Sequence, residues 1–128
     1  MRHINFSQQW DKLKPEKFVE GATLTTFRAY FPWMAKSFEE LRTSKKKATV
    51  TLNKHPIGQV SVEHVSYLWS DKVSSDFIKK DTYHYWTWHD WKQLLEKMYG
   101  IYPVFGIMVT MRIATVDVED LIQQKIIV

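Results

Sequence analysis

One segment of the sequence alternates between apolar and polar residues over an unusual length. Residues 59–69 read QVSVEHVSYLW. β-Branched and aromatic residues that repeat with a period of two are typical of a strand with one buried face. Val60 and Val62 share a face, which we expect to point into a core. A bulge near Val65 is expected to bring Tyr67 and Leu68 into the same core.

The other segments predict the partners of this strand. Further strands are expected at residues 3–7, 23–30, 48–53 and 104–116, a turn at residues 54–58, and helices at residues 74–80, 88–99 and 117–128. The helix over residues 88–99 is predicted by Thr87 as its cap, with Asp90 three residues on, and by the helical spacing of Trp91 and Leu95. Trp88 and Trp91 are expected in the core. Pro32 is expected to end a strand, and a helical turn capped by Ser37 follows it. This order indicates one α+β domain over residues 1–128, with residues 117–128 as a terminal helical extension. Its core would be a mixed β-barrel of about five to six strands, covered by two to three helices.

The charge is uneven along the chain, whose formal net charge is +4. Residues 1–54 carry eleven Lys and Arg against five Asp and Glu, whereas residues 55–128 carry seven against nine. A basic half favours a polyanionic partner, because each phosphate contact releases counterions. Solubility alone explains such a charge equally well.

Composition also excludes some classes of protein. The chain has no Cys, which rules out disulfides and thiolate metal sites. No apolar signal segment is visible, and the longest apolar run is too short to span a bilayer. We therefore expect a soluble cytoplasmic protein with no membrane partner. His84 and His89 are five residues apart and do not share a helix face, so neither a metal site nor a cofactor is expected.

The segment GATLTTFR, residues 21–28, combines a glycine with a threonine-rich strand that ends in arginine. On a strand, Thr26 and Arg28 point to one face and Thr25 and Phe27 to the other. An arginine held on such a face can bind a phosphate or a base edge with two hydrogen bonds. Alternatively, Arg28 pairs with Asp81 or Glu63 and fastens the strand to a helix.

The same segment resembles the signature of the ASCH domains, a branch of the PUA-like β-barrels. That signature reads Gly-x-Lys-x-x-Thr-x-Arg, and here Gly21, Thr26 and Arg28 match it while Thr23 occupies the lysine position. The segments VSVEHV, DFIKKD and WHDWKQLLEKMYG are similar to the central strand, acidic residue and long helix of the family. The resemblance covers roughly residues 3–116 and implies a PUA-like barrel with a cleft beside the second strand.

The resemblance also implies two kinds of site. Some small bacterial members resemble acetylcytidine amidohydrolases, and their chemistry would use Thr26 and, as the carboxylate before the long helix, Asp81. Thr23 argues against that activity, because a hydroxyl cannot replace the amine that an activated nucleophile needs, unless Lys17 or another amine moves in. The chain is therefore more consistent with a binding protein than with an enzyme.

We accordingly expect RNA or nucleotide binding in a basic cleft beside the second strand, with a role in RNA processing or translation-related regulation. The residues expected to bind are Arg28, Thr26, Thr23, Lys45, Lys46, Lys47, Tyr85 and Trp86. The lysines would steer the phosphate backbone, and the two aromatic residues would stack on bases. Two alternatives remain: a hydrolase acting on a modified nucleoside or on RNA, and a protein–protein interaction module.

Overall fold

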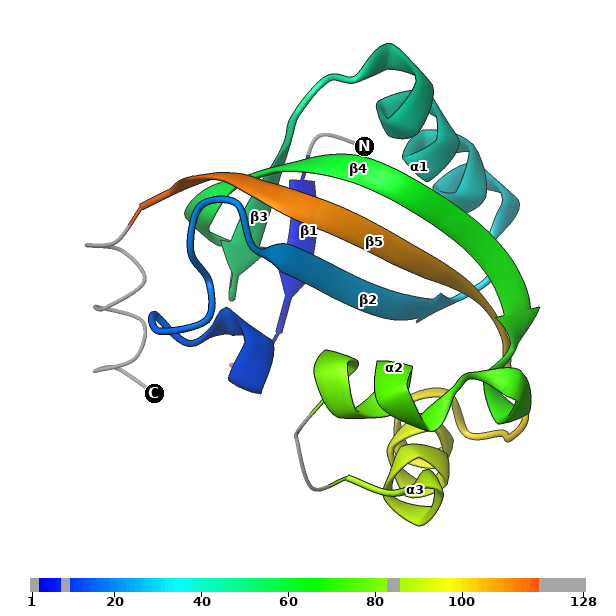
Figure 1. Ribbon diagram of the computed structural model, residues 1–128. Coiled ribbons are helices and arrows are strands. Elements are labelled where there is room, and N and C mark those ends of the chain that lie inside the picture. The colour runs from blue at the N-terminus through cyan, green and yellow to red at the C-terminus, as the bar shows by residue number, and fades with distance from the viewer. Residues whose placement is uncertain (1–2, 8–9, 83–85, 118–128) are drawn as a thin grey trace.

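The fold is a curled, five-stranded sheet with helices on two sides (Figure 1). The computed structural model describes residues 3–7, 10–82 and 86–117. Its strands are β1 (His3–Phe6), β2 (Thr23–Ala29), β3 (Ala48–Leu52), β4 (His55–Trp69) and β5 (Phe105–Val116). Its helices are α1 (Pro32–Ser44), α2 (Ser75–Asp81) and α3 (Trp88–Tyr99), with one-turn 3-10 helices at Asp11–Leu13 and Ser70–Lys72. The α+β class expected from the sequence is confirmed.

The sheet has the strand order β1-β3-β4-β5-β2, so β1 and β2 form its two edges. β1 pairs with β3 in parallel, and the other pairs are antiparallel. The register between β4 and β5 shifts near Val60 and again between Val62 and His64. Such bulges increase the local twist, and the long strands curl into a half-barrel. This curling brings the two edge strands toward each other.

β2 begins after a tight turn in which Gly21 adopts a φ of 85°, a conformation that glycine takes without strain. Alternation along β2 then divides its side chains between two environments. Leu24 packs in the core enclosed by the half-barrel. Phe27, on the opposite face, packs against the Trp91 ring of α3 at a centroid distance of 5.3 Å. β2 therefore lies between the core and the α2–α3 pair.

α1 corrects the expectation of a single turn capped by Ser37. The helix begins five residues earlier, at Pro32, and runs to Ser44. Proline is favoured in the first helical turn, because its missing N–H would have no partner there. Ala35, Phe38 and Leu41 recur on one face and are buried against the sheet. We interpreted Pro32 only as the end of a strand, although it also starts this helix.

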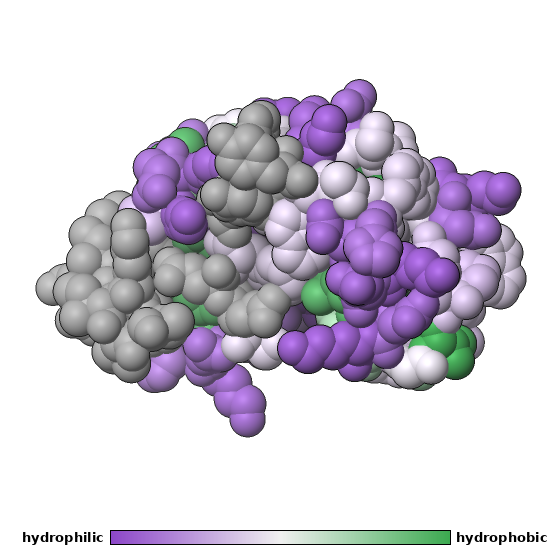
Figure 2. Space-filling view, turned by 90° about the horizontal axis from the view of Figure 1, so that it is seen from below, coloured by the Kyte–Doolittle hydropathy of each residue, from purple (hydrophilic) through white to green (hydrophobic). Residues whose placement is uncertain are grey.

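α2 and α3 cover the other side of the sheet. Thr87 and Asp90 form a reciprocal capping box at the start of α3, as their spacing predicts. Trp91 and Leu95 are buried on its inner face, together with Ile78 of α2. The outer side chains of this layer form the mainly hydrophilic surface in Figure 2.

Some expectations were wrong in detail. Trp88 was expected in the core, but 41% of its surface is exposed. Tyr67 was also expected in the core and is 40% exposed. The predicted turn at residues 54–58 is largely part of β4. The terminal helix expected over residues 117–128 lies almost wholly outside the described residues. Among the described residues, no helix is both long enough and apolar enough to cross a bilayer.

Candidate functional site

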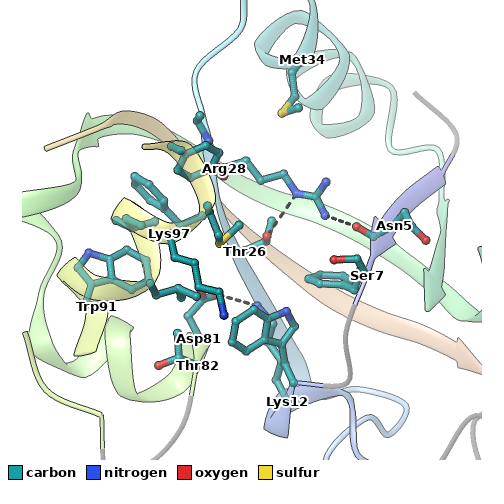
Figure 3. A pocket seen from close by; sticks show the side chains of 18 of the residues that line it. Asn5, Ser7, Lys12, Thr26, Arg28, Met34, Asp81, Thr82, Trp91 and Lys97 are labelled. Carbon is teal, nitrogen blue, oxygen red and sulfur yellow. Dashed lines mark hydrogen bonds and ion pairs between the residues drawn. The ribbon is translucent and has the colours of Figure 1, made fainter. Parts of the chain in front are cut away.

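A pocket of about 490 Å³ lies where the open side of the half-barrel meets α3 (Figure 3). Its walls come from β1, the Asp11–Leu13 turn, β2, the start of α1, the end of α2, and α3. Segments far apart in the sequence thus meet around one hollow. β2 contributes Thr26, Phe27 and Arg28.

Arg28 crosses the open side of the half-barrel from one edge strand to the other. Its Nη2 donates to the carbonyl oxygen of Asn5 on β1 at 2.9 Å, and its Nε donates to Thr26 Oγ1 at 3.4 Å. The Phe6 ring lies beneath the guanidinium, 5.3 Å from Cζ to the ring centroid. Among the described residues, no carboxylate lies within ion-pair distance of Arg28. We considered Asp81 and Glu63 as partners, but Asp81 pairs with Lys12 and Glu63 with Arg112.

A second polar cluster lies beside the pocket, and two of its members, Lys12 and Asp81, line the wall. Lys12 Nζ donates to Asp81 Oδ1 at 2.7 Å and to the carbonyl oxygen of Thr25 at 2.6 Å. Thr25 Oγ1 donates to the same Asp81 oxygen at 2.9 Å. The side chains of Lys12 and Asp81 are each only 8% exposed. This Lys12–Thr25–Asp81 cluster joins the N-terminal segment, β2 and α2.

Burial lowers the pKa of both cations. Loss of water lowers the pKa of Lys12, an effect that the Asp81 carboxylate opposes and the Arg28 guanidinium reinforces. The pKa of Arg28 is also lowered, mainly by burial, while Tyr99 and Asp81 act in the other direction. The charged forms of both groups would therefore gain from an additional anionic partner in the pocket.

Aromatic and aliphatic side chains make up the rest of the pocket wall. They include Trp10, Phe31, Met34, Trp91, Met98 and Tyr99. Lys97 of α3 also lines the pocket. A hollow of this size, with apolar walls and a few convergent polar groups, has the properties of a small-molecule site.

The structure brings together only some of the residues expected to form the site. Arg28, Thr26 and Asp81 all line the pocket. Thr23 is exposed at the start of β2 and does not line it. Lys45, Lys46 and Lys47 follow the C-terminal end of α1, whereas the pocket meets the start of that helix. The 13 residues of α1 span roughly 20 Å, so these lysines lie well away from the pocket.

Neither of the two aromatic residues expected to stack on bases is among the described residues that line the pocket. Trp86 is half-buried, and its ring meets the Trp10 ring edge-on at 6.3 Å. Trp10 itself lines the pocket, so Trp86 contacts a wall residue without lining the pocket. Tyr85 lies outside the described residues.

Sequence reasoning missed Lys12, Asn5 and Lys97. We considered Lys17 as a replacement amine, and Lys12 is the lysine that reaches Asp81. Lys12 and Asp81 are 69 residues apart, and a single helical turn gives Lys12 no periodic signal. Asn5 contributes a backbone carbonyl, which no sequence pattern can reveal.

Among the described residues, no cluster of three or more His, Asp or Glu side chains could hold a metal ion. Comparisons with known proteins add no assignment. No family model matches this chain, and neither a curated protein nor a solved structure matches it significantly. The resemblance to the ASCH domains therefore stays a prediction, and a function has to be argued from the pocket itself.

Proposed function

We propose that the pocket beside β2 binds one nucleotide, either free or as part of an RNA. One observation carries the proposal: Arg28 reaches into the pocket bound only to a carbonyl oxygen and a hydroxyl, with no carboxylate partner among the described residues. Its Nη1 makes no hydrogen bond within the described chain. That edge of the guanidinium is free to donate to a phosphate or to the acceptor edge of a base.

Size and wall chemistry support this ligand class. The volume of about 490 Å³ is within the usual range of small-ligand sites. Aromatic walls such as Trp10, Phe31 and Tyr99 suit a planar base, because a base can stack on a ring or pack against its edge.

The charges in the pocket favour an anionic ligand. Lys12 and Asp81 compensate each other at 2.7 Å. Arg28 and Lys97 then remain as an excess of positive charge in the wall. A phosphate group would satisfy this excess and would offset the burial that lowers the pKa of Arg28.

Calorimetric titration with the four ribonucleoside 5′-monophosphates and their parent nucleosides tests the proposal. We expect at least one monophosphate to bind more tightly than its nucleoside, and its affinity to fall as salt rises. Arg28→Met should weaken that binding about 10- to 150-fold, since hydrogen bonds to charged groups contribute about 1.5–3 kcal/mol. Arg112→Gln, on the exposed part of β5, is the matched control and should bind normally. Absence of binding at low salt, or equal binding by Arg28→Met, would refute the proposal.

A second candidate function is hydrolysis of an acyl group on a modified nucleoside. The Lys12–Thr25–Asp81 cluster favours it, because a buried amine beside a carboxylate supplies the group that Thr23 lacks. Asp81 would accept a proton from an attacking water, and Lys12 would stabilise the negative charge that develops on the acyl oxygen. Cleavage of the acyl C–N bond would then release the amine of the nucleoside and a carboxylate. Incubation with acetylcytidine and chromatographic detection of cytidine tests this function. Turnover by the wild type that disappears in folded Asp81→Asn supports it, and no turnover by the wild type rejects it for this substrate.

A further inference from the structure

Six exposed aromatic side chains gather beside the pocket, at the end of β2 and β4 and the start of β5 and α1. We name them the aromatic platform; its members are Tyr30, Phe31, Trp33, Tyr67, Trp69 and Phe105. Each exposes between 36% and 62% of its surface. In Figure 1 this is the end of the sheet where the chain leaves β2 and enters α1.

Ring contacts divide the platform into a group of four rings and a pair of rings. Tyr30 meets Tyr67 at a ring-centroid distance of 5.9 Å and Phe105 at 5.4 Å, and Phe105 meets Trp69 at 5.4 Å. The backbone N–H of Tyr30 donates to the carbonyl of Phe105 at 2.9 Å, which holds this group in place. The next residue, Phe31, stacks on Trp33 at 6.4 Å. Each ring thus contacts at least one other ring, and the two groups meet in the chain at the adjacent residues Tyr30 and Phe31.

Exposure of so many rings is unfavourable unless something covers them. A fully buried aromatic side chain removes about 150–250 Å² from water, so six rings exposed to this extent leave several hundred Å² of apolar surface in contact with solvent. Patches of this size on a single domain are often functional.

The platform continues directly from the pocket. Phe31 belongs to both, because it lines the pocket and stacks on Trp33. Tyr30 directly follows the end of β2 and precedes Phe31 in the chain. A chain molecule with one unit in the pocket would therefore meet the Phe31–Trp33 pair of the platform next.

Charge around the platform is compatible with a polyanion. Glu39 accepts a hydrogen bond from Tyr67 at 3.1 Å and forms an ion pair with Arg42 at 2.7 Å. Lys36 is exposed one turn after Trp33 on α1. The platform offers ring surfaces, on which any base can stack, beside the cationic groups of the pocket.

We propose that the aromatic platform stacks the bases of a single-stranded nucleic acid, of which one nucleotide occupies the pocket. This inference rests on the proposed function, and it extends a mononucleotide site into a site for several consecutive nucleotides. Stacking on one ring is expected to change affinity by about 5- to 150-fold per base.

The test compares a mononucleotide with fluorescently labelled single-stranded RNA and DNA oligonucleotides of one to eight residues. Calorimetry measures the mononucleotide, and fluorescence anisotropy measures the oligonucleotides. The variants are Trp33→Ala, Trp33→Phe and Trp33→Leu; Trp33 is 62% exposed, so none of them empties the core. Trp88→Ala removes an exposed tryptophan outside platform and pocket and serves as the control. Circular dichroism checks that each variant is folded.

We expect affinity to rise with oligonucleotide length in the wild type and to fall about 5- to 150-fold for the longer oligonucleotides in Trp33→Ala. Mononucleotide binding should be unchanged, Trp33→Phe should retain most of the affinity, and Trp33→Leu should resemble Trp33→Ala. Trp88→Ala should bind like the wild type.

Three results would overturn the inference. If oligonucleotide affinity does not grow with length, or if Trp33→Ala leaves that affinity unchanged, the platform is rejected. The proposed function still stands in that case, provided that mononucleotides bind. Oligonucleotide affinity of Trp33→Leu equal to that of the wild type would show that general apolar contact, not stacking, holds the bases. A change of oligomeric state in Trp33→Ala, measured by sedimentation, would assign the surface to contact between copies of the chain. Conversely, Trp33-dependent oligonucleotide binding without any mononucleotide binding supports the platform and rejects the proposed function.

Discussion

The Lys12–Asp81 ion pair allows a quantitative prediction, because both side chains are almost fully buried and the pair joins two segments that are distant in the sequence. At 2.7 Å and an effective dielectric constant of about 20, the attraction of two unit charges is about 6 kcal/mol. Removing each ion from water costs several kcal/mol, so the pair as a whole contributes little net stability. Removal of one partner is different, because the other charge stays buried without compensation.

We therefore predict a strongly non-additive double-mutant cycle. Lys12→Met should lower the free energy of unfolding by about 3–5 kcal/mol, and Asp81→Asn by a similar amount. The double variant should lose only about 1–3 kcal/mol, mainly because the Thr25 carbonyl loses its donor. The coupling between the two sites should thus be at least about 3 kcal/mol.

Urea unfolding at pH 7, followed by tryptophan fluorescence, measures the cycle. A domain of this kind has about 5–15 kcal/mol of stability, so all four proteins should be compared in the same stabilising osmolyte if a single variant unfolds in plain buffer. Effects that add within about 0.5 kcal/mol would mean that the two side chains do not interact in solution. In that case the Lys12–Thr25–Asp81 cluster would not form beside the pocket.

Further predictions concern pH, packing and capping. The pKa of Lys12 in the folded protein lies below its ordinary value of 10.5, so between the folded-state and unfolded-state pKa the unfolded chain binds more protons. The free energy of unfolding should therefore rise with pH across that window. Urea unfolding at several pH values measures the rise, which should vanish in Lys12→Met. Gly106→Ala would place a Cβ against the Phe27 ring and should cost about 1–3 kcal/mol by thermal unfolding; an unchanged midpoint would show that the ring moves freely. Thr87→Ala removes half of the capping box with Asp90 and should cost about 1 kcal/mol in the same assay, without changing nucleotide affinity.

Local signals in the sequence predicted the elements that depend on local chemistry. The capping box of Thr87 and Asp90 and the spacing of Trp91 and Leu95 correctly placed α3. Alternation correctly placed β2 and most of β4. Pro32 was misread because the same residue can end a strand and occupy the first turn of a helix, and only the tertiary contacts of Phe38 decide between them.

The candidate site was less predictable, because its key contacts are long-range. The parity of Thr26 and Arg28 on a strand was enough to direct attention to the correct face. The partner of Asp81, however, depends on how a short N-terminal turn packs 69 residues away, and sequence spacing carries no information about that. The exposure of the six rings could not be predicted either, since the sequence pattern around an aromatic residue is the same whether or not another element covers its ring.

The central claim is that the pocket beside β2 receives a nucleotide, and a structural map of binding tests it most directly. Titration of the isotope-labelled protein with the tightest-binding monophosphate should shift amide NMR signals of residues that line the pocket, such as Thr26, Arg28, Leu95 and Tyr99. Signals of β3 and of the C-terminal end of α1 should stay in place. Shifts confined to the lysines at residues 45–47, or no shifts at saturating ligand, would contradict the account.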